Sequence, residues 1–178
     1  YLEDLQRNGL VIIQARDGYR FSADSVILAH FAANVSLKGT VVDLGTGSGV
    51  IALLLSARCP GLKLVGLELQ QKEADRASRS VLLNQEILTK LGSSVEIIHG
   101  DLRQVAAYIK PGSVDAAISN PPFISEGAGP VNRNLEIALS RQEISCTLED
   151  VFEAALVILK NKGRFFLVHK PSRLPDIC

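Results

Sequence analysis

The chain has 178 residues, of which 47% are hydrophobic and 21% are charged, which suits one globular domain and excludes a disordered or collagen-like chain. Its 19 Lys and Arg residues balance its 19 Asp and Glu residues, so the formal net charge is zero. A neutral chain argues against a protein that binds nucleic acid mainly by neutralising many phosphates.

The three cysteines, Cys59, Cys146 and Cys178, show no C-x-x-C or His-paired spacing. This pattern indicates reduced thiols in a cytoplasmic protein, with no disulfide frame and no metal site. The longest apolar run, Val50 to Leu55, is far shorter than the roughly 20 residues of a membrane span, and no signal segment opens the chain. Because the chain starts at Tyr1 and contains no Met, we expect the native start to be missing.

The first elements in chain order are a predicted hairpin and helix. The runs Leu10–Gln14 and Tyr19–Phe21 flank an Asp17-Gly18 turn, which predicts two paired strands. Ser22 is typical of a helix N-cap, and the helix is expected to cover Ala23 to about Asn34. We expect this segment to form a small flap over the edge of a sheet.

Five apolar runs then predict the buried strands of a parallel sheet: Val41–Leu44, Leu64–Leu67, Val95–Ile98, Val114–Ser119 and Arg164–His169. Helices are expected between them, at Val50–Cys59, about Gln71–Leu88, Leu102–Ile109 and Leu148–Lys160. The last helix follows a capping-box pattern, Thr147-x-x-Asp150. The fold class is therefore α/β with a doubly wound sheet, in which residues 1–36 form the flap and residues 37–178 the body.

A glycine-rich loop, Gly45-Thr46-Gly47-Ser48-Gly49, follows the first parallel strand and opens a helix. A doubly wound sheet binds nucleotides at this position. Gly45 and Gly47 allow close approach of the backbone to a ligand, and Gly49 allows the helix to pack on the strand. Glu68 ends the second strand, where a carboxylate is suited to bind ribose hydroxyls.

Two ligands fit this loop. Dinucleotide-binding loops have the spacing G-x-G-x-x-G and bind a pyrophosphate at the helix N-terminus, whereas the spacing here is G-x-G-x-G. Asp43 directly precedes the loop, which is unfavourable for a diphosphate but suits an ammonium group. S-adenosylmethionine carries an ammonium and a sulfonium and no phosphate, so the loop favours it over NAD.

Asp101 and Leu102 follow the third strand and are further candidate contacts of the ligand. Asp101 can accept a hydrogen bond from the exocyclic amine of an adenine, or it can cap the helix that follows. Its position alone does not separate these two alternatives.

The fourth strand runs into Asn120-Pro121-Pro122-Phe123. Proline fixes φ and forces the residue before it into extended geometry, so Asn120 and the carbonyl of Pro121 are held rigidly. An amide or aromatic amine is a poor nucleophile because its lone pair is delocalised. Two acceptors, the Asn120 side-chain oxygen and the Pro121 carbonyl, would draw both N–H bonds out of plane and aim the lone pair at a methyl sulfonium. Phe123 offers an aromatic face on which a base extruded from the nucleic-acid stack can lie.

These motifs together resemble the class I S-adenosylmethionine-dependent amino-methyltransferases, through Asp43–Gly49, Glu68, Gly100-Asp101 and Asn120–Phe123. Three longer segments, Phe21–Ala29, Arg141–Asp150 and Val168–Leu174, resemble more narrowly the bacterial tRNA(Val) adenine N6-methyltransferases, which modify the adenine beside the anticodon.

The resemblance implies a Rossmann-like fold, a tRNA substrate and two sets of site residues. Asn120, Pro121, Pro122 and Phe123 would hold the target adenine, and Asp43, Gly45, Thr46, Gly47, Gly49, Glu68, Asp101 and Leu102 would hold S-adenosylmethionine. Phe123 stands where many relatives carry Tyr. Such domains end with two further strands, so we expect C-terminal strands to be missing after Cys178, which would leave an open sheet edge.

Basic residues gather near the end of the chain, where residues 160–178 contain five Lys or Arg against Asp176 alone. Lys170 and Arg173 are expected at the carboxyl end of the fifth strand, on the same side as Asn120, where they would contact RNA phosphates. Arg133, in an irregular stretch after the tetrapeptide, is a third candidate contact. The alternative for this segment is a solvated surface.

The predicted function is methyl transfer from S-adenosylmethionine to N6 of an adenine in tRNA. Methylation of a protein glutamine amide or of guanine N2 in ribosomal RNA is an alternative, because these amines present the same chemical problem. A cofactor-binding module without catalysis is a further alternative, although such a module has no need of Asn120–Phe123. No metal and no membrane partner are expected, and the sequence does not predict the oligomeric state.

Overall fold

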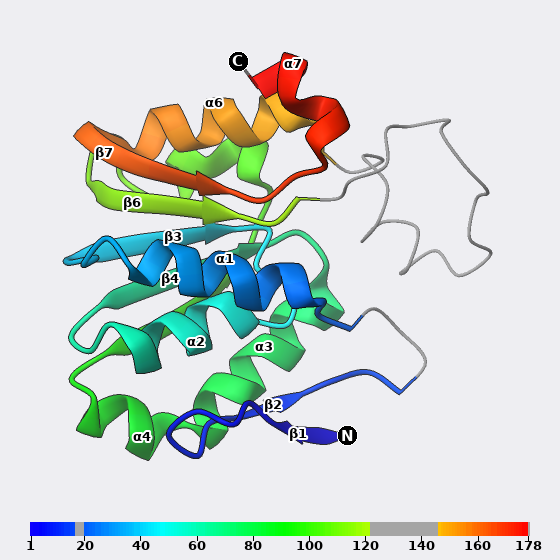
Figure 1. The fold of residues 1–178 in the computed structure, drawn as a ribbon, viewed down its shortest axis with the longest axis vertical. Coiled ribbons are helices and arrows are strands. Elements are labelled where there is room, and N and C mark those ends of the chain that lie inside the picture. Colours follow the sequence, from blue (N-terminus) through cyan, green and yellow to red (C-terminus); the bar gives the residue numbers. More distant parts are fainter. Residues whose placement is uncertain (17–19, 122–145, 178) are drawn as a thin grey trace.

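The computed structural model describes residues 1–16, 20–121 and 146–177. Its centre is a five-stranded parallel sheet with helices packed on both faces (Figure 1). The strands are β3 (Thr40–Leu44), β4 (Lys63–Glu68), β5 (Ser94–His99), β6 (Val114–Ser119) and β7 (Leu159–Leu167), in the spatial order β5-β4-β3-β6-β7. The prediction of a doubly wound α/β sheet is confirmed.

The two faces of the sheet bury separate apolar clusters because successive side chains of a strand point to opposite faces. Val41 packs with α1 (Ala23–Ala33) and α2 (Val50–Arg58), whereas its neighbour Val42 packs with η1 (Leu102–Ala107) and α6 (Leu148–Ile158). The first six residues of α2 are all buried, which explains why this helix is apolar around its whole circumference. The sheet is thus covered on both sides, as the continuous apolar strands predict.

Helix α6 begins at the predicted capping box. The hydroxyl of Thr147 accepts a hydrogen bond from the N–H of Asp150 at 3.2 Å, and the N–H of Thr147 donates to the Asp150 carboxylate at 2.8 Å. The helix ends at Ile158, two residues earlier than predicted, because Leu159 is already extended and pairs with Val114 of β6. Regular pairing of β7 with β6 resumes at Arg164, the predicted start of that strand.

The predicted helix over residues 71–88 is divided at Asn84 into α3 (Gln71–Leu83) and α4 (Gln85–Lys90). The Asn84 side chain is buried and binds the backbone of Val11, accepting from its N–H at 2.9 Å and donating to its carbonyl at 2.6 Å. The hydroxyl of Ser80, one turn earlier, accepts from the N–H of Ile13 at 3.0 Å. Ser80 of α3 and Asn84 at the C-cap of this helix therefore anchor β2 (Val11–Ile13).

The predicted hairpin joins the wrong pair of strands. β2 (Val11–Ile13) pairs antiparallel with the upstream strand β1 (Leu2–Asp4), and Arg20 and Phe21 lie outside any strand. The connecting loop contains Asn8-Gly9 with φ of 53° and 76°, a pair of left-handed residues typical of tight hairpin turns. The Asp17-Gly18 turn and Tyr19 lie outside the described residues.

Helix α1 follows the hairpin and packs along α2 (Figure 1). Ser22 occupies its N-cap position, but its hydroxyl donates to the Asp24 carboxylate at 3.1 Å instead of binding a backbone group. The division of the chain into residues 1–36 and 37–178 stays a prediction. Within the described ranges, no helix has the length and apolar character needed to cross a membrane.

Candidate active site

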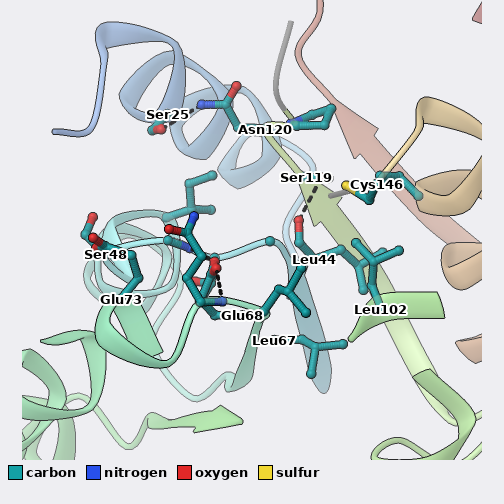
Figure 2. A pocket seen from close by; sticks show the side chains of 18 of the residues that line it. Ser25, Leu44, Ser48, Leu67, Glu68, Glu73, Leu102, Ser119, Asn120 and Cys146 are labelled. Atoms are coloured by element: carbon teal, nitrogen blue, oxygen red, sulfur yellow. Dashed lines mark hydrogen bonds between the residues drawn. The ribbon is translucent and has the colours of Figure 1, made fainter. Parts of the chain in front are cut away.

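A cavity of about 920 Å³, open mouth included, lies at the carboxyl ends of β3, β4 and β6 (Figure 2). The chain winds outward from β3 through β4 to β5 and then returns through β6 on the other side, so β3 and β6 flank the point where the winding reverses. Doubly wound sheets bind their ligands at this point. The Ser119 hydroxyl at the end of β6 donates to the carbonyl of Leu44 at the end of β3 at 2.8 Å, which joins the two strand ends.

The glycine loop forms one wall of the cavity and is held by its own backbone. The N–H groups of Gly45 and Thr46 donate to the carbonyl of Leu67 at 2.9 and 3.0 Å. Gly45 and Gly47 line the cavity with φ of 75° and 55°, and a Cβ at either position would meet no protein atom within 4 Å. Glycine is thus required for the backbone conformation, and it leaves open space for a ligand against the peptide groups.

Glu68 ties the glycine loop to β4. One carboxylate oxygen accepts the N–H of Gly47 and the other accepts the N–H of Gln70, both at 2.8 Å. Burial raises the pKa of Glu68, although these backbone donors oppose the effect. Because a carboxylate has about four acceptor positions, Glu68 can hold the loop and still accept hydrogen bonds from a ligand's hydroxyl groups.

Asp43 and Gly49 support the loop from behind and are not among the residues that line the cavity. The hydroxyl of Thr46 donates to the buried Asp43 carboxylate at 2.6 Å. Burial raises the pKa of Asp43 to about 7, and the Thr46 hydrogen bond acts in the opposite direction. Gly49 is the left-handed N-cap of α2, and a Cβ there would lie 3.3 Å from Cβ of Ala77 in α3. Direct cofactor contacts of Asp43 and Gly49 stay predictions.

Asp101 and Leu102 line the cavity at the end of β5. Asp101 is the N-cap of η1, where its carboxylate accepts the N–H of Arg103 at 3.0 Å and pairs with the Arg103 guanidinium. The hydrogen bond from the Arg103 side chain holds the pKa of Asp101 below its usual range. The capping alternative is therefore confirmed, and a contact of Asp101 with an adenine stays a prediction.

Asn120 and Pro121 line the cavity, and Figure 2 shows Asn120 on the side opposite Glu68. The Asn120 side-chain amide donates from Nδ2 to the hydroxyl of Ser25 in α1 at 2.9 Å. Its Oδ1 is buried and accepts no hydrogen bond from the described part of the chain. Asn120 thus offers a hydrogen-bond acceptor that no described residue uses. The predicted mechanism requires such an acceptor to bind one N–H of a substrate amine. Pro122 and Phe123 lie outside the described residues.

Several lining residues were not predicted. Phe21 and Ser25 come from the N-terminal segment, and Ser48, Gln70 and Glu73 come from the loop and the start of α3. Glu73 pairs through one oxygen with Arg76, while its other oxygen and the Ser48 hydroxyl are buried without a hydrogen-bond partner among the described residues. Ser48 is part of the glycine loop and Gln70 follows Glu68 closely, so their positions could have suggested them. Ser25 lies in the family-like segment Phe21–Ala29, but nothing in that segment indicates a contact with Asn120.

The basic segment near the C-terminus is divided between the two ends of the sheet. Lys160 pairs with Asp115 at 2.6 Å near the amino end of β6, away from the cavity. Lys170 and Arg173 follow β7 at the carboxyl end, the same edge of the sheet as Asn120, but they do not line the cavity. Arg133 lies outside the described residues. No metal-binding group of His, Cys, Asp or Glu occurs within residues 1–16, 20–121 and 146–177.

Comparisons with known proteins identify the fold and the family. The family model of the methyltransferase small domain matches residues 22–174. The tRNA1(Val) (adenine(37)-N6)-methyltransferase of Proteus mirabilis is 32% identical over 150 residues, covering 84% of this chain and 56% of that protein. The enzyme of that name from Porphyromonas gingivalis is 30% identical over 171 residues, covering 89% of this chain and 61% of the relative. The chain thus spans about three-fifths of the length of these curated relatives.

A shorter match and a solved structure complete the comparison. A release factor glutamine methyltransferase from Enterococcus faecalis is 35% identical over 94 residues, or 53% of this chain and 30% of that protein. The crystal structure of a predicted O-methyltransferase from Agrobacterium tumefaciens superposes with a TM-score of 0.64 at 22% identity, covering 86% of this chain and 64% of the other. This structural likeness confirms the predicted Rossmann-like fold.

Proposed function

Because the chain belongs to the methyltransferase small domain family, we propose that it transfers the methyl group of S-adenosylmethionine to N6 of an adenine in tRNA. The observation that carries this proposal is the buried Oδ1 of Asn120, which lines the glycine-loop cavity and accepts no hydrogen bond from residues 1–16, 20–121 or 146–177. The relatives named as tRNA1(Val) adenine methyltransferases support the choice of substrate. A cytoplasmic location belongs to the same proposal.

The lining residues fit S-adenosylmethionine. Gly45 and Gly47 leave open space against their peptide groups, and Glu68 offers acceptor positions for ribose hydroxyls beside them. The carboxyl groups of Asp43 and Glu68 lie behind and beside the loop, where a cationic ligand stabilises their ionised forms and a diphosphate does not. Leu102, Leu67 and Leu44 provide an apolar wall for an adenine ring. Bound S-adenosylmethionine supplies an electrophilic methyl group on a sulfonium.

The protein's part in the reaction is to localise a lone pair on the acceptor nitrogen. Asn120 Oδ1 accepts one N–H of the exocyclic amine, and the carbonyl of Pro121 accepts the other, so that the nitrogen becomes pyramidal and its lone pair faces the methyl group. Bound S-adenosylmethionine would supply the methyl carbon to this nitrogen and would keep the electron pair of the broken carbon–sulfur bond on its sulfur. Asn120 and Pro121 hold the nitrogen, and its extra proton passes to solvent water afterwards, so no strong base is required before attack. Pro122 and Phe123 complete the proposed contact with the base.

Contacts with the rest of the tRNA are proposed for Lys170, Arg173 and Arg133. Lys170 is exposed and follows β7 at the edge of the sheet that carries Asn120. Three basic residues give only local phosphate contact, in keeping with a net charge of zero. The tRNA is therefore expected to present one unstacked base to the cavity instead of being wrapped by the protein.

The glutamine match favours a second candidate, methylation of a protein glutamine amide. To separate the two, the whole protein is incubated with methyl-labelled S-adenosylmethionine and either unmodified tRNA(Val), ribosomal RNA or a release-factor protein. We expect label in tRNA, recovered as N6-methyladenosine after nuclease digestion. Label in protein alone, or in guanine N2 of ribosomal RNA, would contradict the proposed substrate.

A further inference from the structure

The N-terminal helix α1 contributes a hydroxyl group to the side of the cavity that carries Asn120 and Pro121, called the acceptor side below. Ser25 lies in the first turn of α1 and is 4% exposed, and it lines the cavity together with Asn120. Its Oγ accepts a hydrogen bond from Nδ2 of Asn120 at 2.9 Å, across 95 residues of sequence. Figure 2 shows the two side chains facing each other at the edge of the cavity.

The contact with Ser25 bears on which end of the Asn120 side-chain amide faces the cavity. The amide has a carbonyl oxygen that accepts and an NH₂ group that donates, and rotation of the amide by half a turn exchanges them. Only the orientation with Oδ1 toward the cavity can accept an N–H from a substrate amine. In the opposite orientation, the NH₂ group would face the NH₂ group of the substrate, donor against donor.

We propose that Ser25 is a positioning residue for methyl transfer: its hydroxyl oxygen accepts the hydrogen bond from Nδ2 of Asn120, which stabilises the side chain in the position that faces Oδ1 to the acceptor amine. This inference rests on the proposed role of Asn120 in methyl transfer. A buried Oδ1 that no described residue binds is the expected result of such an arrangement, because the NH₂ group of the same amide is already bound to Ser25. The N-terminal segment thus takes part in the reaction through Asn120 without touching the methyl group.

The first experiment compares Ser25→Ala with wild-type protein and with the control Ser56→Ala. Ser56 is fully buried in the adjacent helix α2, its hydroxyl donates to the carbonyl of Leu53 at 2.7 Å, and it does not line the cavity. We expect Ser25→Ala to lower kcat about tenfold, with the Kd for S-adenosylmethionine and the KM for the acceptor within about twofold of wild type. Ser56→Ala should leave kcat within about twofold, and Ser25→Thr, which keeps the hydroxyl, should restore most of it.

The second experiment repeats Ser25→Ala in the Asn120→Ala background, with incorporation of label followed over long incubations. If Ser25 acts through Asn120, its removal there changes the residual rate by less than about twofold. A merely structural role would cost the same factor in both backgrounds. An equal loss in both, or a weakened cofactor Kd with normal kcat, would overturn the inference while leaving the proposed methyl transfer intact.

A readout without activity separates this inference from the proposed function. The side-chain NH₂ protons of Asn120, followed by nuclear magnetic resonance, should exchange with water several-fold faster in Ser25→Ala than in wild type or Ser56→Ala, because a hydrogen bond that protects them is lost. Unchanged exchange contradicts the inference. If the wild-type protein methylates a protein glutamine instead of tRNA, the proposed substrate is wrong, and the same variants are then measured on the glutamine substrate, whose amide also presents two N–H bonds.

Discussion

The two sides of the cavity are held in different ways. The loop side is fixed from within one β-α-β unit, because Leu67 and Glu68 of β4 bind the backbone of the loop that follows β3, and Asp43 near the end of β3 binds Thr46. The acceptor side is fixed by Ser25, which comes from a helix 95 residues away from Asn120. The comparison teaches that the glycine loop is fixed within one contiguous β-α-β unit, whereas the side of the cavity that carries Asn120 depends on a long-range contact.

The largest expected effect is on the acceptor side. Asn120→Ala removes the buried Oδ1 and should lower kcat at least 100-fold, about 3 kcal/mol, by analogy with the loss of one preorganised hydrogen-bonding group in other enzymes. The Kd for S-adenosylmethionine, measured by calorimetry, should stay within about twofold. Full turnover by this variant would show that the two sides do not divide their tasks in this way.

The next effect concerns pH and the buried carboxylate behind the loop. Asp43 has a pKa of about 7 in the folded protein against 3.8 when unperturbed, so the folded state holds a proton that the unfolded state has lost at pH values between these two. Folding stability should therefore fall as pH rises, by about 2–3 kcal/mol between pH 5 and pH 8 for the cofactor-free protein. Denaturant unfolding at several pH values measures this slope.

Asp43→Asn provides the control for the pH prediction. The Asn oxygen can still accept the Thr46 hydroxyl, but the side chain does not titrate, so the pH slope should flatten. If the slope of the variant matches wild type, another group causes it.

Glu68→Gln should affect the loop side alone. Gln has one acceptor oxygen in place of two, so either the loop N–H of Gly47 or that of Gln70 loses its partner, and an acceptor for ribose is lost as well. We expect the Kd for S-adenosylmethionine to rise about 30-fold, about 2 kcal/mol, with kcat at saturating cofactor within about threefold. A large fall of kcat with an unchanged Kd would break the comparison between the two sides.

The smallest effect is expected at the anchor of the N-terminal segment. Asn84→Ala leaves the N–H and carbonyl of Val11 without their partner and should lower the free energy of unfolding by about 1–2 kcal/mol. Thr89→Ala, an exposed position in α4 whose hydroxyl donates to the carbonyl of Gln85, should change it by less than about 0.5 kcal/mol. If the folded fraction of Asn84→Ala keeps wild-type kcat, the hairpin supports stability and α1 alone positions Ser25.

The difference between the two sides also explains what could be predicted from the sequence. The five strands, the glycine loop, Glu68 and the Thr147 cap follow from local patterns, and the structure has them where expected. The predicted hairpin differs from the structure because the prediction rests on the Asp17-Gly18 turn, whereas the paired strands are joined through Asn8-Gly9, an equally strong turn signal nearer the N-terminus.

The remaining misses involve contacts between distant segments. Asn84 divides a helix because its side chain binds Val11, and nothing in the residues around position 84 indicates that partner. Ser25 reaches Asn120 only because α1 packs on α2 and brings its first turn to the end of β6. The capping role of Asp101 is one of its two predicted roles, and the hydrogen bond from the N–H of Arg103 shows it, whereas the adenine contact stays a prediction.

The anchoring of β2 by α3 has a consequence for how the protein behaves at high concentration. A short strand with an unpaired edge can recruit a strand of another molecule and start aggregation. Here, Asn84 and Ser80 occupy two N–H groups and one carbonyl along the edge of β2 that faces away from β1. The side chains of a helix thus take the place of a neighbouring strand, and the N-terminal hairpin is protected from edge-to-edge association at these positions.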